Sequence, residues 1–468
     1  MDLRELFGSG APPVEVTALA YDNRAVAPGT VFFCVRGMTR DGHEFAPDAI
    51  ARGAAALVVD HPLGLGVPEV LVPDVRAAMA PAAAKLAGDP TAELKVIGIT
   101  GTNGKTTSAY IVRALLEAAG VRTGQLGTVT SVIAGVEAPA IRTTPEAIDL
   151  QRTFREMLDG GDVACAMEVS SHALELHRAD AIHWAVAVFT NLTQDHLDFH
   201  DDMEAYFAAK RRLFEAGPQA SVINVDDPFG RRLAADFDAV TIAIDHDADL
   251  RAEHVRFGLD GSTFTVDGLE LRTPLPGRFN ALNVLGAVAV ARELGIDDAT
   301  IARAVPQAGR VPGRFEPVDE GQPFAVLVDY AHTPDSLENV LRAARQLAPG
   351  CVICVFGAGG DRDRGKRPAM GRIAGELADV PIVTSDNPRS EDPEAIIAEI
   401  VAGMSAAPIT EPDRRAAIDR AIGLAAEGDV VVIAGKGHEQ GQEFAGGHKV
   451  PFDDVAVARE VLRARLVA

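Results

Sequence analysis

The chain has 468 residues, of which 47% are hydrophobic and 24% charged, the balance of an ordinary globular protein with about three domains. Its formal net charge of −23 argues against non-specific binding to nucleic acid or to an anionic membrane surface. No apolar run approaches the ~18 residues that cross a bilayer, and residues 1–13 lack the apolar core of a signal peptide, so we expect a cytoplasmic protein.

The first 93 residues predict a small α/β domain. An alanine-rich helix precedes a break at 88–90 (GDP), and short apolar runs predict strands at 31–35, 56–60 and 69–73. Residues 94–308 predict a central domain in which strands alternate with helices, the rhythm of a doubly wound, mostly parallel sheet. Its clearest strands are expected at 163–169, 186–191 and 221–227.

A segment with Asp-Gly and Gly-Ser turns, 251–275, alternates apolar and polar residues and predicts an antiparallel hairpin insertion. The glycine- and proline-rich stretch 309–318 marks the start of a C-terminal α/β domain, 309–468. Four strands are expected there, at 324–330, 351–357, 380–386 and 429–435. A CxxC pair, Cys351 and Cys354, falls on one of them and favours a core strand over a redox or zinc site.

The chain is organised around the stretch from Lys95 to Gly120, which predicts a strand, a glycine turn and a helix. Such a turn lets backbone N–H groups approach phosphate oxygens at a helix N-terminus. Gly101 and Gly104 are closer together than the glycines of the general P-loop, whose first glycine position is Ile99 here. Lys105 would contact the β/γ oxygens, and Thr106 would offer its hydroxyl to Mg²⁺.

Polar residues follow two strands of the central domain, where open α/β sheets bind ligands. Glu168 ends one strand and is a natural Mg²⁺ ligand beside a phosphate loop. The loop 191–200 (NLTQDHLDFH) carries His196 and His200, but it lacks the glutamate of a zinc hydrolase. From these residues alone, a hydrogen-bonded loop and a metal site are equally good interpretations. The helix 202–214 carries Lys210 in a charge run of the kind that usually faces solvent.

Three polar loops follow strands of the C-terminal domain: 357–368 (GAGGDRDRGKRP), 385–393 (SDNPRSEDP) and 434–440 (AGKGHEQ). Arginine matches carboxylates bidentately, so the three loops together could bind a zwitterion that has more than one charged end. Any one of them alone is more often a surface loop.

With GTNGKTT, MEVSSHAL, NLTQDHLDFH, the Lys210 helix, FNALNVLGA, VDYAHTPDSL, GDRDRGKRP, DNPR and GKGHE in this order, the chain resembles the Mur ligase family over all three predicted domains. The resemblance implies an N-terminal UDP-binding domain, a central ATP-binding domain and a Rossmann-like C-terminal domain. It also implies an ATP-dependent ligase of peptidoglycan precursor synthesis, and DNPR with GKGHE implies that meso-diaminopimelate is joined to UDP-N-acetylmuramoyl-L-alanyl-D-glutamate through an acyl phosphate.

For ATP and two Mg²⁺ ions, the resemblance implies four catalytic and metal-binding residues and a set of nucleotide contacts. One ion would be held by Thr106 and Glu168, and the other by His196 and a carbamylated Lys210. Arg211 and Arg212 would keep the lysine amine neutral enough to react with CO₂. The nucleotide contacts would be Gly101, Thr102, Asn103, Gly104, Lys105, Thr106, Thr107, Asn283, Arg314 and Asp329.

For the UDP-linked dipeptide, the implied contacts are Asn23, Met38, Thr39, Arg40, Thr143, Thr144, Ser170 and Arg178. Asn23 stands where relatives often have Ser, and Leu176 where they often have Gln. For diaminopimelate, Arg389 would hold the distal carboxylate, and the surrounding residues would be Arg362, Asp386, Asn387, Pro388, Gly435 and Glu439. We expect a monomer that acts on small molecules, with no nucleic acid or membrane partner.

Three other classes share parts of this pattern. A folylpolyglutamate synthetase would share the ATP loop, but it has no reason to carry a uridine domain or DNPR. An ATP-hydrolysing switch would release phosphate without an amino acid. A non-catalytic nucleotide-binding scaffold leaves Glu168, His196 and Lys210 unexplained.

Overall fold

The computed structural model describes residues 1–37, 40–258 and 260–466, and the chain divides into two compact units. Unit 1 comprises Met1–Thr100, Ala119–Val188 and Ala208–Ser221. Unit 2 comprises Gly101–Ala118, Phe189–Phe207 and Val222–Ala468. Among the described residues, no helix is long and apolar enough to cross a membrane.

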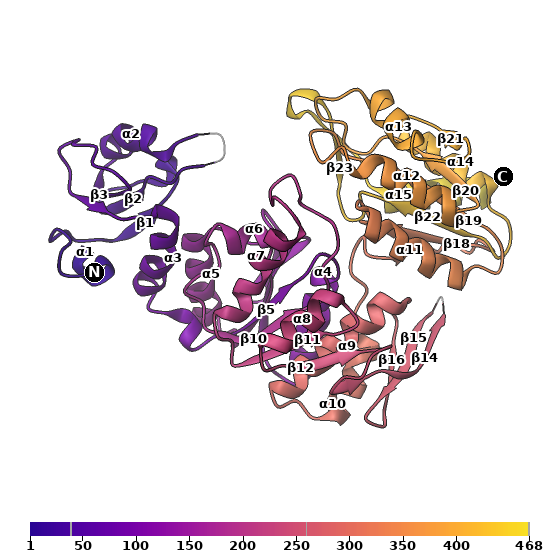
Figure 1. Ribbon diagram of the computed structural model, residues 1–468, viewed down its shortest axis with the longest axis horizontal. Helices are drawn as coiled ribbons and strands as arrows, with labels where there is room; N and C mark the ends of the chain where they lie inside the picture. The colour runs from indigo at the N-terminus through magenta and orange to yellow at the C-terminus, as the bar shows by residue number, and fades with distance from the viewer. Residues whose placement is uncertain (38–39, 259, 467–468) are drawn as a thin grey trace. The chain divides into compact units, whose positions relative to one another are not determined.

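The N-terminal part of unit 1 is a parallel four-stranded sheet in the order β1-β2-β3-β4 (indigo in Figure 1). Its strands are β1 (Ala18–Ala20), β2 (Thr30–Phe33), β3 (Ala54–Val59) and β4 (Glu69–Leu71). Alternate residues cover opposite faces: Val31 and Phe33 pack with α1 (Leu3–Phe7) and α3 (Val75–Leu86), whereas Phe32 packs with α2 (Ala46–Ala51). The predicted strands of residues 1–93 are confirmed within a few residues. Short 3₁₀ turns are η1 (Asn23–Ala25), η2 (Gly42–Phe45) and η3 (Pro90–Ala92).

The rest of unit 1 holds strands in the order β10-β5-β9-β6-β7-β8. They are β5 (Lys95–Thr100), β6 (Thr123–Leu126), β7 (Thr130–Ile133), β8 (Val136–Pro139), β9 (Ala164–Glu168) and β10 (Trp184–Phe189). Both β5 and β6 run parallel to β9, and β7 and β8 form an antiparallel extension. The helices are α5 (Ala147–Asp159) and α6 (Ser171–Glu175). Two further elements have residues in both units: helix α7 (Met203–Glu215) and strand β11 (Ala220–Asn224).

The first helix of unit 2 is α4 (Lys105–Ala118), which follows the glycine turn. It packs with α9 (Arg278–Glu293). Strand β11 is followed in parallel by β12 (Val240–Ala243) and β13 (Leu250–Arg251). The predicted insertion is antiparallel, as expected, but it has three strands: β14 (Glu253–Gly258), β15 (Gly261–Val266) and β16 (Leu269–Thr273). The remaining helices here are α8 (Pro228–Asp236), α10 (Asp298–Ala304) and η4 (Val305–Gln307).

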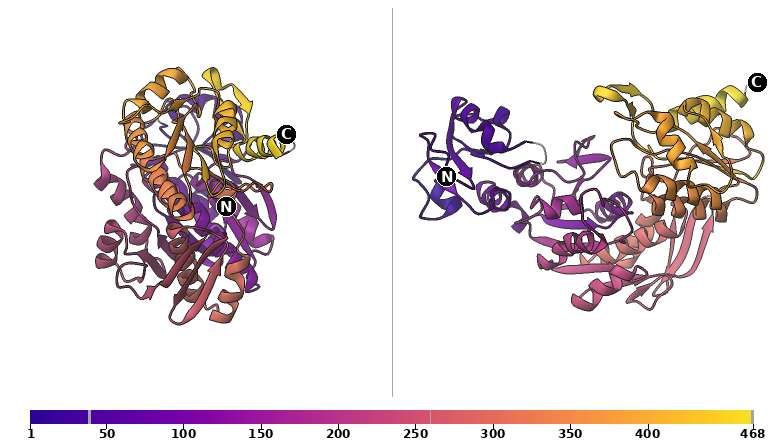
Figure 2. Two further views of the ribbon diagram at one scale, coloured as in Figure 1. Left: turned by 90° about the vertical axis from the view of Figure 1, so that its right-hand side faces the viewer. Right: turned by 45° about the horizontal axis from the view of Figure 1, so that its top comes forward.

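The C-terminal sheet has the order β17-β18-β22-β19-β20-β21 and is parallel except for β17. Leu327 and Cys354 face helices α11, α12 and α13, whereas Val326 and Ile353 face α14 and α15, so the sheet is covered on both sides (Figure 2). The strands are β17 (Glu316–Pro317), β18 (Ala325–Asp329), β19 (Val352–Phe356), β20 (Val380–Val383), β21 (Ile409–Thr410) and β22 (Val430–Ala434). The helices are α11 (Pro334–Leu347), α12 (Lys366–Leu377), α13 (Pro393–Val401), α14 (Arg414–Leu424) and α15 (Asp454–Leu466).

All four expected strands of this domain are confirmed, and the pattern missed the two short edge strands. It also missed a hairpin, β23 (Gly441–Glu443) and β24 (Lys449–Pro451), which is followed by α15; between its strands lies η5 (Ala445–Gly447). The CxxC prediction is correct for Cys354, which is buried in β19. It is wrong for Cys351, which precedes the strand and is exposed.

Candidate active site

The turn between β5 and α4 has a backbone that requires glycine. Gly101 and Gly104 have φ angles of 148° and 86°. A Cβ on Gly101 would lie 1.9 Å from Oγ1 of Thr190, and one on Gly104 would lie 2.4 Å from Oδ1 of Asn283. Lys105 Nζ donates to the carbonyl oxygens of Gly101 and Thr102, at 2.8 and 2.7 Å. The turn is therefore a tight backbone loop with its lysine folded over it.

The loop after β10 holds this turn in shape. Asn191 accepts a hydrogen bond from the backbone N–H of Asn103 at 2.9 Å, and its amide donates to the carbonyl oxygen of Asn103 at 3.1 Å. Thr190 Oγ1 donates to the same carbonyl at 2.6 Å, and Thr102 Oγ1 donates to the carbonyl of Thr193 at 3.1 Å. Residues 190–193 thus serve as a scaffold for the glycine turn, a role that the sequence did not reveal.

Three of the predicted nucleotide residues lie against the turn or next to one another. Asn283 is buried on α9 and accepts from Ser108 Oγ at 3.4 Å. Arg314 donates to Thr106 Oγ1 at 3.2 Å, and its guanidinium lies 4.6 Å from the centre of the Tyr330 ring. Asp329 accepts from the backbone N–H of Phe315 at 2.6 Å, and burial raises the pKa of Asp329 to about 6 although Arg314 opposes the shift.

Asp195, beside the predicted His196, belongs to a cluster of charged groups in unit 2. Burial alone would raise the pKa of Asp195, but His196, His332 and Lys366 outweigh it and hold that pKa below its usual value. Burial lowers the pKa of His332 and of Lys366, the first residue of α12. His196 itself has a φ of 56° and lies 3.3 Å from Asp195 Oδ2 through Nε2. The sequence motifs contained His332 and Lys366, but nothing singled them out.

Glu168 ends β9 and is 1% exposed. Its two carboxylate oxygens accept from Thr128, one from the backbone N–H at 2.7 Å and one from Oγ1 at 3.0 Å. Thr143 Oγ1 lies 3.1 Å from Thr128 Oγ1, and Thr144 Oγ1 donates to the carbonyl of Glu168 at 2.9 Å. Ser170 donates to Thr144 Oγ1 through its backbone N–H at 3.1 Å. Three predicted residues, Thr143, Thr144 and Ser170, are therefore brought together around Glu168.

An arginine cluster lies beside these threonines. Arg178, Arg76 and Arg142 contact the buried carboxylate of Glu146 at 3.0, 3.2 and 3.0 Å, and Arg178 Nη1 also donates to the carbonyl of Thr144 at 3.5 Å. Burial lowers the pKa of Arg178, and the charges of Arg142 and Arg76 add to that shift. Three guanidinium groups on one carboxylate leave an excess of positive charge, which suits an anionic ligand. The sequence revealed Arg178 alone.

Lys210 is 1% exposed on α7. Arg211 pairs with Glu215 at 2.8 Å, and Arg212 pairs with Glu175 at 3.3 Å, so each arginine has a carboxylate of its own. Lys210 is thus buried in the protein and does not face solvent as its charge run predicted.

Residues of the three C-terminal loops form a C-terminal polar cluster. Asn387 donates to Glu439 at 2.8 Å and accepts from the buried Lys436 at 2.9 Å. Arg389 donates to Glu443 at 3.0 Å and to the carbonyl of Gly360 at 2.7 Å. The cluster comprises the predicted Arg362, Asp386, Asn387, Pro388, Arg389, Gly435 and Glu439, together with Lys436 and Glu443.

Close backbone approaches bring the other predicted residues into this cluster. A Cβ on Gly435 would lie 2.5 Å from Asp386 Oδ2, and one on Gly360 would lie 1.9 Å from the carbonyl oxygen of Pro388. A Cβ on Gly359 would lie 3.1 Å from Arg389 Nη1 and 3.9 Å from Arg362 Cγ. Asp386 Oδ2 is buried with no hydrogen-bond partner among the described residues. Carboxylates and a guanidinium converging in this way fit an amino acid that carries both amines and carboxylates.

The predicted uridine residues receive less support. Asn23 Nδ2 donates to Asp48 at 2.7 Å, and Arg40 lies 6.0 Å from the centre of the Phe45 ring. Met38 and Thr39 lie outside the described residues.

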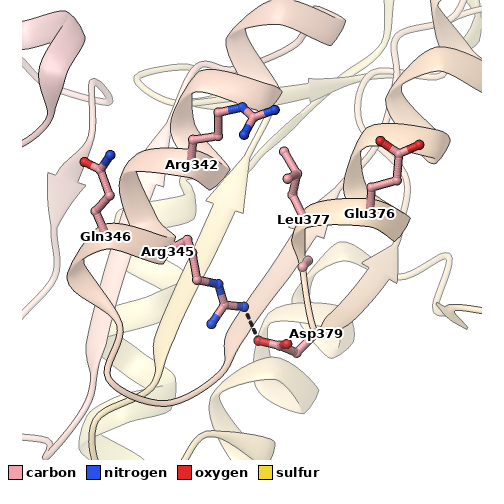
Figure 3. A pocket seen from close by; sticks show the side chains of 7 residues that line it. Arg342, Arg345, Gln346, Glu376, Leu377 and Asp379 are labelled. Atoms are coloured by element: carbon pink, nitrogen blue, oxygen red, sulfur yellow. Dashed lines mark hydrogen bonds and ion pairs between the residues drawn. The ribbon is translucent and has the colours of Figure 1, made fainter.

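A pocket at the ends of α11 and α12 contains none of the predicted residues (Figure 3). Arg345 pairs there with Asp379, and Arg342 pairs with Glu338 at 2.7 Å. These charges are already matched within the protein. The pocket is lined by Arg342, Arg345, Gln346, Glu376, Leu377, Ala378 and Asp379.

Comparisons with known proteins give one consistent result. Three family models match successive parts of the chain: "Mur ligase family, catalytic domain" at residues 15–95, "Mur ligase middle domain" at 99–291, and "Mur ligase, glutamate ligase domain" at 313–437. The chain is 48% identical to UDP-N-acetylmuramoyl-L-alanyl-D-glutamate--2,6-diaminopimelate ligase of Geobacillus thermodenitrificans (strain NG80-2) over 470 aligned residues, which cover 96% of each.

Solved structures agree in fold. A structure described as a UDP-N-acetylmuramoyl-L-alanyl-D-glutamate--2,6-diaminopimelate ligase is similar with a TM-score of 0.71 and 32% identity, covering 100% of this chain and 99% of that one. The MurF ligase from Thermotoga maritima, solved in complex with ADP, is similar with a TM-score of 0.63 and 18% identity, covering 96% of each chain.

Proposed function

The chain belongs to the Mur ligase family, and on that premise we propose that it is an ATP-dependent ligase that joins meso-2,6-diaminopimelate to UDP-N-acetylmuramoyl-L-alanyl-D-glutamate. The observation that carries the proposal is the 48% identity, over 96% of each chain, to a ligase with that name. The C-terminal polar cluster supports the choice of amine, because it combines a guanidinium with carboxylates. The product would be a peptidoglycan precursor needed for cell shape and division.

The glycine turn would bind the phosphates of ATP through its backbone, as a turn at the N-terminus of α4 can do. Lys105 would leave its two carbonyl partners and contact the β/γ oxygens. Thr102, Asn103, Thr107, Asn283, Arg314 and Asp329 complete the proposed nucleotide contacts. The D-glutamate γ-carboxylate attacks the γ-phosphate to give an acyl phosphate and ADP, and the amine of diaminopimelate then displaces phosphate to form the amide. Lys105 and Arg314 would offset the negative charge that meets in the first step.

The proposal includes two Mg²⁺ ions, one with Thr106 and Glu168 as ligands and the other with His196 and a carbamylated Lys210. The donor set fits a hard cation, because Glu168 offers a buried carboxylate that is already oriented by Thr128, and a carbamate would add two more oxygens. Bound Mg²⁺ would neutralise phosphate charge during transfer. Burial of Lys210 supports an amine that is neutral and able to react with CO₂.

Arg389 would hold the distal carboxylate of diaminopimelate by competing with Glu443 for its guanidinium. Asp386 and Glu439 would accept from its ammonium groups, and Arg362, Asn387, Pro388 and Gly435 would shape the site. L-Lysine lacks the distal carboxylate and would leave Arg389 without that partner, which costs free energy in a desolvated site.

The UDP-linked substrate would contact Thr143, Thr144, Ser170 and Arg178 through its pyrophosphate and sugar-peptide portions. The arginine cluster on Glu146 supports an anion there. Asn23 and the segment Met38–Arg40 remain the proposed uridine contacts. The proposal retains functional domains at 1–93, 94–308 and 309–468, a monomer, and a cytoplasmic location.

The test is phosphate release from ATP by the purified full chain, with each co-substrate omitted in turn. We expect release only when the UDP-dipeptide and meso-diaminopimelate are both present, with a product whose mass corresponds to the amide. Equal release without the amine would indicate an ATP-hydrolysing switch, and turnover of folate substrates would indicate the folylpolyglutamate class. Either outcome would overturn the proposal.

A further inference from the structure

Two histidines and an aspartate meet at the carboxyl end of the N-terminal sheet. His43 lies in the 3₁₀ turn η2, and Asp60 and His61 directly follow β3. One ligand atom from each of the three side chains lies within 4.8 Å of the others, and they form the sole group of this kind among the described residues. His43 is buried, Asp60 is half-buried and His61 is exposed. None of these residues takes part in the ligase chemistry proposed above.

The His43 ring is fixed in one orientation. Its Nδ1 lies 2.6 Å from Oδ1 of Asp41, and a carboxylate can only accept, so Nδ1 carries the hydrogen. The backbone N–H of His43 also donates to that oxygen, at 3.0 Å, which fixes Asp41 in turn. A carboxylate that holds the far nitrogen of an imidazole is the usual second partner of a metal-binding histidine.

The other nitrogen of His43 faces Asp60. Nε2 lies 3.3 Å from Oδ1 of Asp60 and accepts from the backbone N–H of Asp60 at 3.5 Å. The single lone pair of Nε2 cannot serve both this N–H and a cation, so a bound ion would replace the long 3.5 Å hydrogen bond. Because an imidazole lone pair and a carboxylate oxygen repel each other, either a proton or a cation between them stabilises this arrangement.

His61 approaches the same oxygen from the solvent side. Its Nδ1 lies 2.5 Å from Oδ1 of Asp60, and by the same rule it carries a hydrogen, which metal binding would have to displace. The centres of the two imidazole rings are 4.6 Å apart. Ligand atoms around a tetrahedral Zn²⁺ with bonds of about 2.0–2.1 Å are roughly 3.3 Å apart. The spacing of His43 and Asp60 already matches that value. The 2.5 Å between His61 Nδ1 and Asp60 Oδ1 would have to lengthen by about 0.8 Å to match it, and the His61 side chain, 49% exposed, has room to move.

From this geometry we propose that His43, Asp60 and His61 bind a divalent transition-metal ion of the Zn²⁺ class. Two imidazole nitrogens and one carboxylate favour Zn²⁺, Co²⁺ or Ni²⁺ over Mg²⁺ or Ca²⁺, which prefer oxygen ligands. Three protein ligands leave a fourth position for water. Arg36 contacts both nearby carboxylates, Asp60 at 2.9 Å and Asp41 at 3.7 Å, so one guanidinium offsets part of the charge of two carboxylates and leaves net negative charge for the ion. The ion would join η2 to the segment after β3 and stabilise the folded N-terminal sheet.

The experiment is a titration of the chelator-treated full chain with Zn²⁺, in excess Mg²⁺ so that sites preferring oxygen ligands are filled. The test variant is His61→Ala, a surface change with little risk to folding. The matched control is His183→Ala, which removes another exposed histidine of unit 1 that pairs with a single aspartate, Asp89, at 3.1 Å. Co²⁺ serves as a second probe, because four-coordinate Co²⁺ absorbs in the visible range.

We expect the wild type and His183→Ala to bind one Zn²⁺ equivalent with the same Kd. In His61→Ala the Kd of that equivalent should rise at least tenfold. The corresponding Co²⁺ absorption should weaken in His61→Ala alone, and Zn²⁺ should raise the Tm of the wild type and the control but not of His61→Ala. Equal Zn²⁺ affinity and stoichiometry in the wild type and His61→Ala would overturn the proposal and leave a hydrogen-bonded histidine pair.

Discussion

The glycine turn and the C-terminal polar cluster present ligand-binding groups in opposite ways. In residues 101–107 the backbone would be the binding surface, and side chains such as Asn191 and Thr190 hold it in place. In the C-terminal polar cluster the side chains would be the binding surface, and Arg389 already has partners within the protein. A backbone surface suits phosphate, which many enzymes bind, whereas a set of paired charges can discriminate among amino acids. On the proposed function, ATP binding and the choice of amine would therefore depend on two different kinds of structure in one chain.

The largest expected effect concerns a buried ion pair that contacts the backbone next to the C-terminal polar cluster. Arg414 and Asp454 form a fully buried pair at 2.7 Å, and Arg414 also donates to the carbonyls of Ala434 and Ser385, which adjoin Gly435 and Asp386. Arg414→Leu should lower the free energy of unfolding by about 3–5 kcal/mol, because it leaves a buried carboxylate unpaired. Urea unfolding measures this change.

The exposed pair Arg415–Glu460, at 2.6 Å, joins the same two helices and provides the control. Arg415→Leu should cost less than about 1 kcal/mol. If both variants lost the same stability, the unpaired buried carboxylate would not be the cause of the loss.

The second prediction tests the backbone surface of the turn. Gly101→Ala should reduce kcat/KM for ATP by about a thousandfold, because the new Cβ would displace Thr190 and with it the loop that holds the turn. Steady-state phosphate release measures the change. Gly120→Ala is the control, since Gly120 also has a positive φ, 78°, but has no atom within 4 Å of an added Cβ. It should retain most activity at a stability cost of about 1 kcal/mol. Equal losses in the two variants would mean that strain, not the approach of Thr190, governs the effect.

The third prediction concerns Asp329, whose folded-state pKa of about 6 lies above the ordinary value of 3.8. A raised carboxyl pKa means that the folded state binds the proton more tightly, so stability falls as pH rises from about 4 to about 6. The difference in unfolding free energy between the wild type and Asp329→Asn should decline by up to about 3 kcal/mol across that range and be constant above it. Urea unfolding at a series of pH values measures this difference, and no change between pH 4 and 6 would contradict the raised pKa.

The fourth prediction tests the side-chain surface. Arg389→Ala should reduce kcat/KM for meso-diaminopimelate by about 100-fold, the cost of about two charged hydrogen bonds, while the Kd for ATP stays within about twofold. Arg372→Ala removes an exposed arginine that pairs with Glu376, and it should match the wild type. A weakened ATP affinity in Arg389→Ala would mean that the two surfaces are not separate.

The buried strands and the glycine turn could be predicted because their pattern is local. Runs such as 352–356 and 430–434 are apolar at every position, and the turn carries glycine where the backbone demands it. Strand β8 could not be predicted, because all four of its residues are exposed and lack an apolar face. Helix α4 begins at Lys105, four residues before the helical spacing of apolar residues begins at Ala109. Its first turn consists of polar residues of the phosphate loop, which carry no apolar pattern.

Site residues could be predicted where they belong to a recognisable sequence motif. They could not be predicted where only tertiary contacts bring them to the site. Asn387 and Glu439 were named by their motifs, but the buried Lys436 between them was not, because a lysine beside glycines is typical of a surface loop. Arg76 reaches Glu146 from 70 residues away, and no spacing rule connects the two. Arg142 is only four residues from Glu146, but no sequence pattern indicated that three arginines meet at this carboxylate. The role of Asn191 as a support for the turn depends in the same way on tertiary contacts.

The most direct test of the account is the ratio of kcat/KM for meso-diaminopimelate to kcat/KM for L-lysine, measured with the wild-type chain under saturating ATP and UDP-dipeptide. The two amino acids differ in the distal carboxylate that Arg389 is proposed to bind. We expect a ratio of at least about a thousand, because a site built around a charged partner rejects the analogue that lacks it. A ratio near one would contradict this expectation.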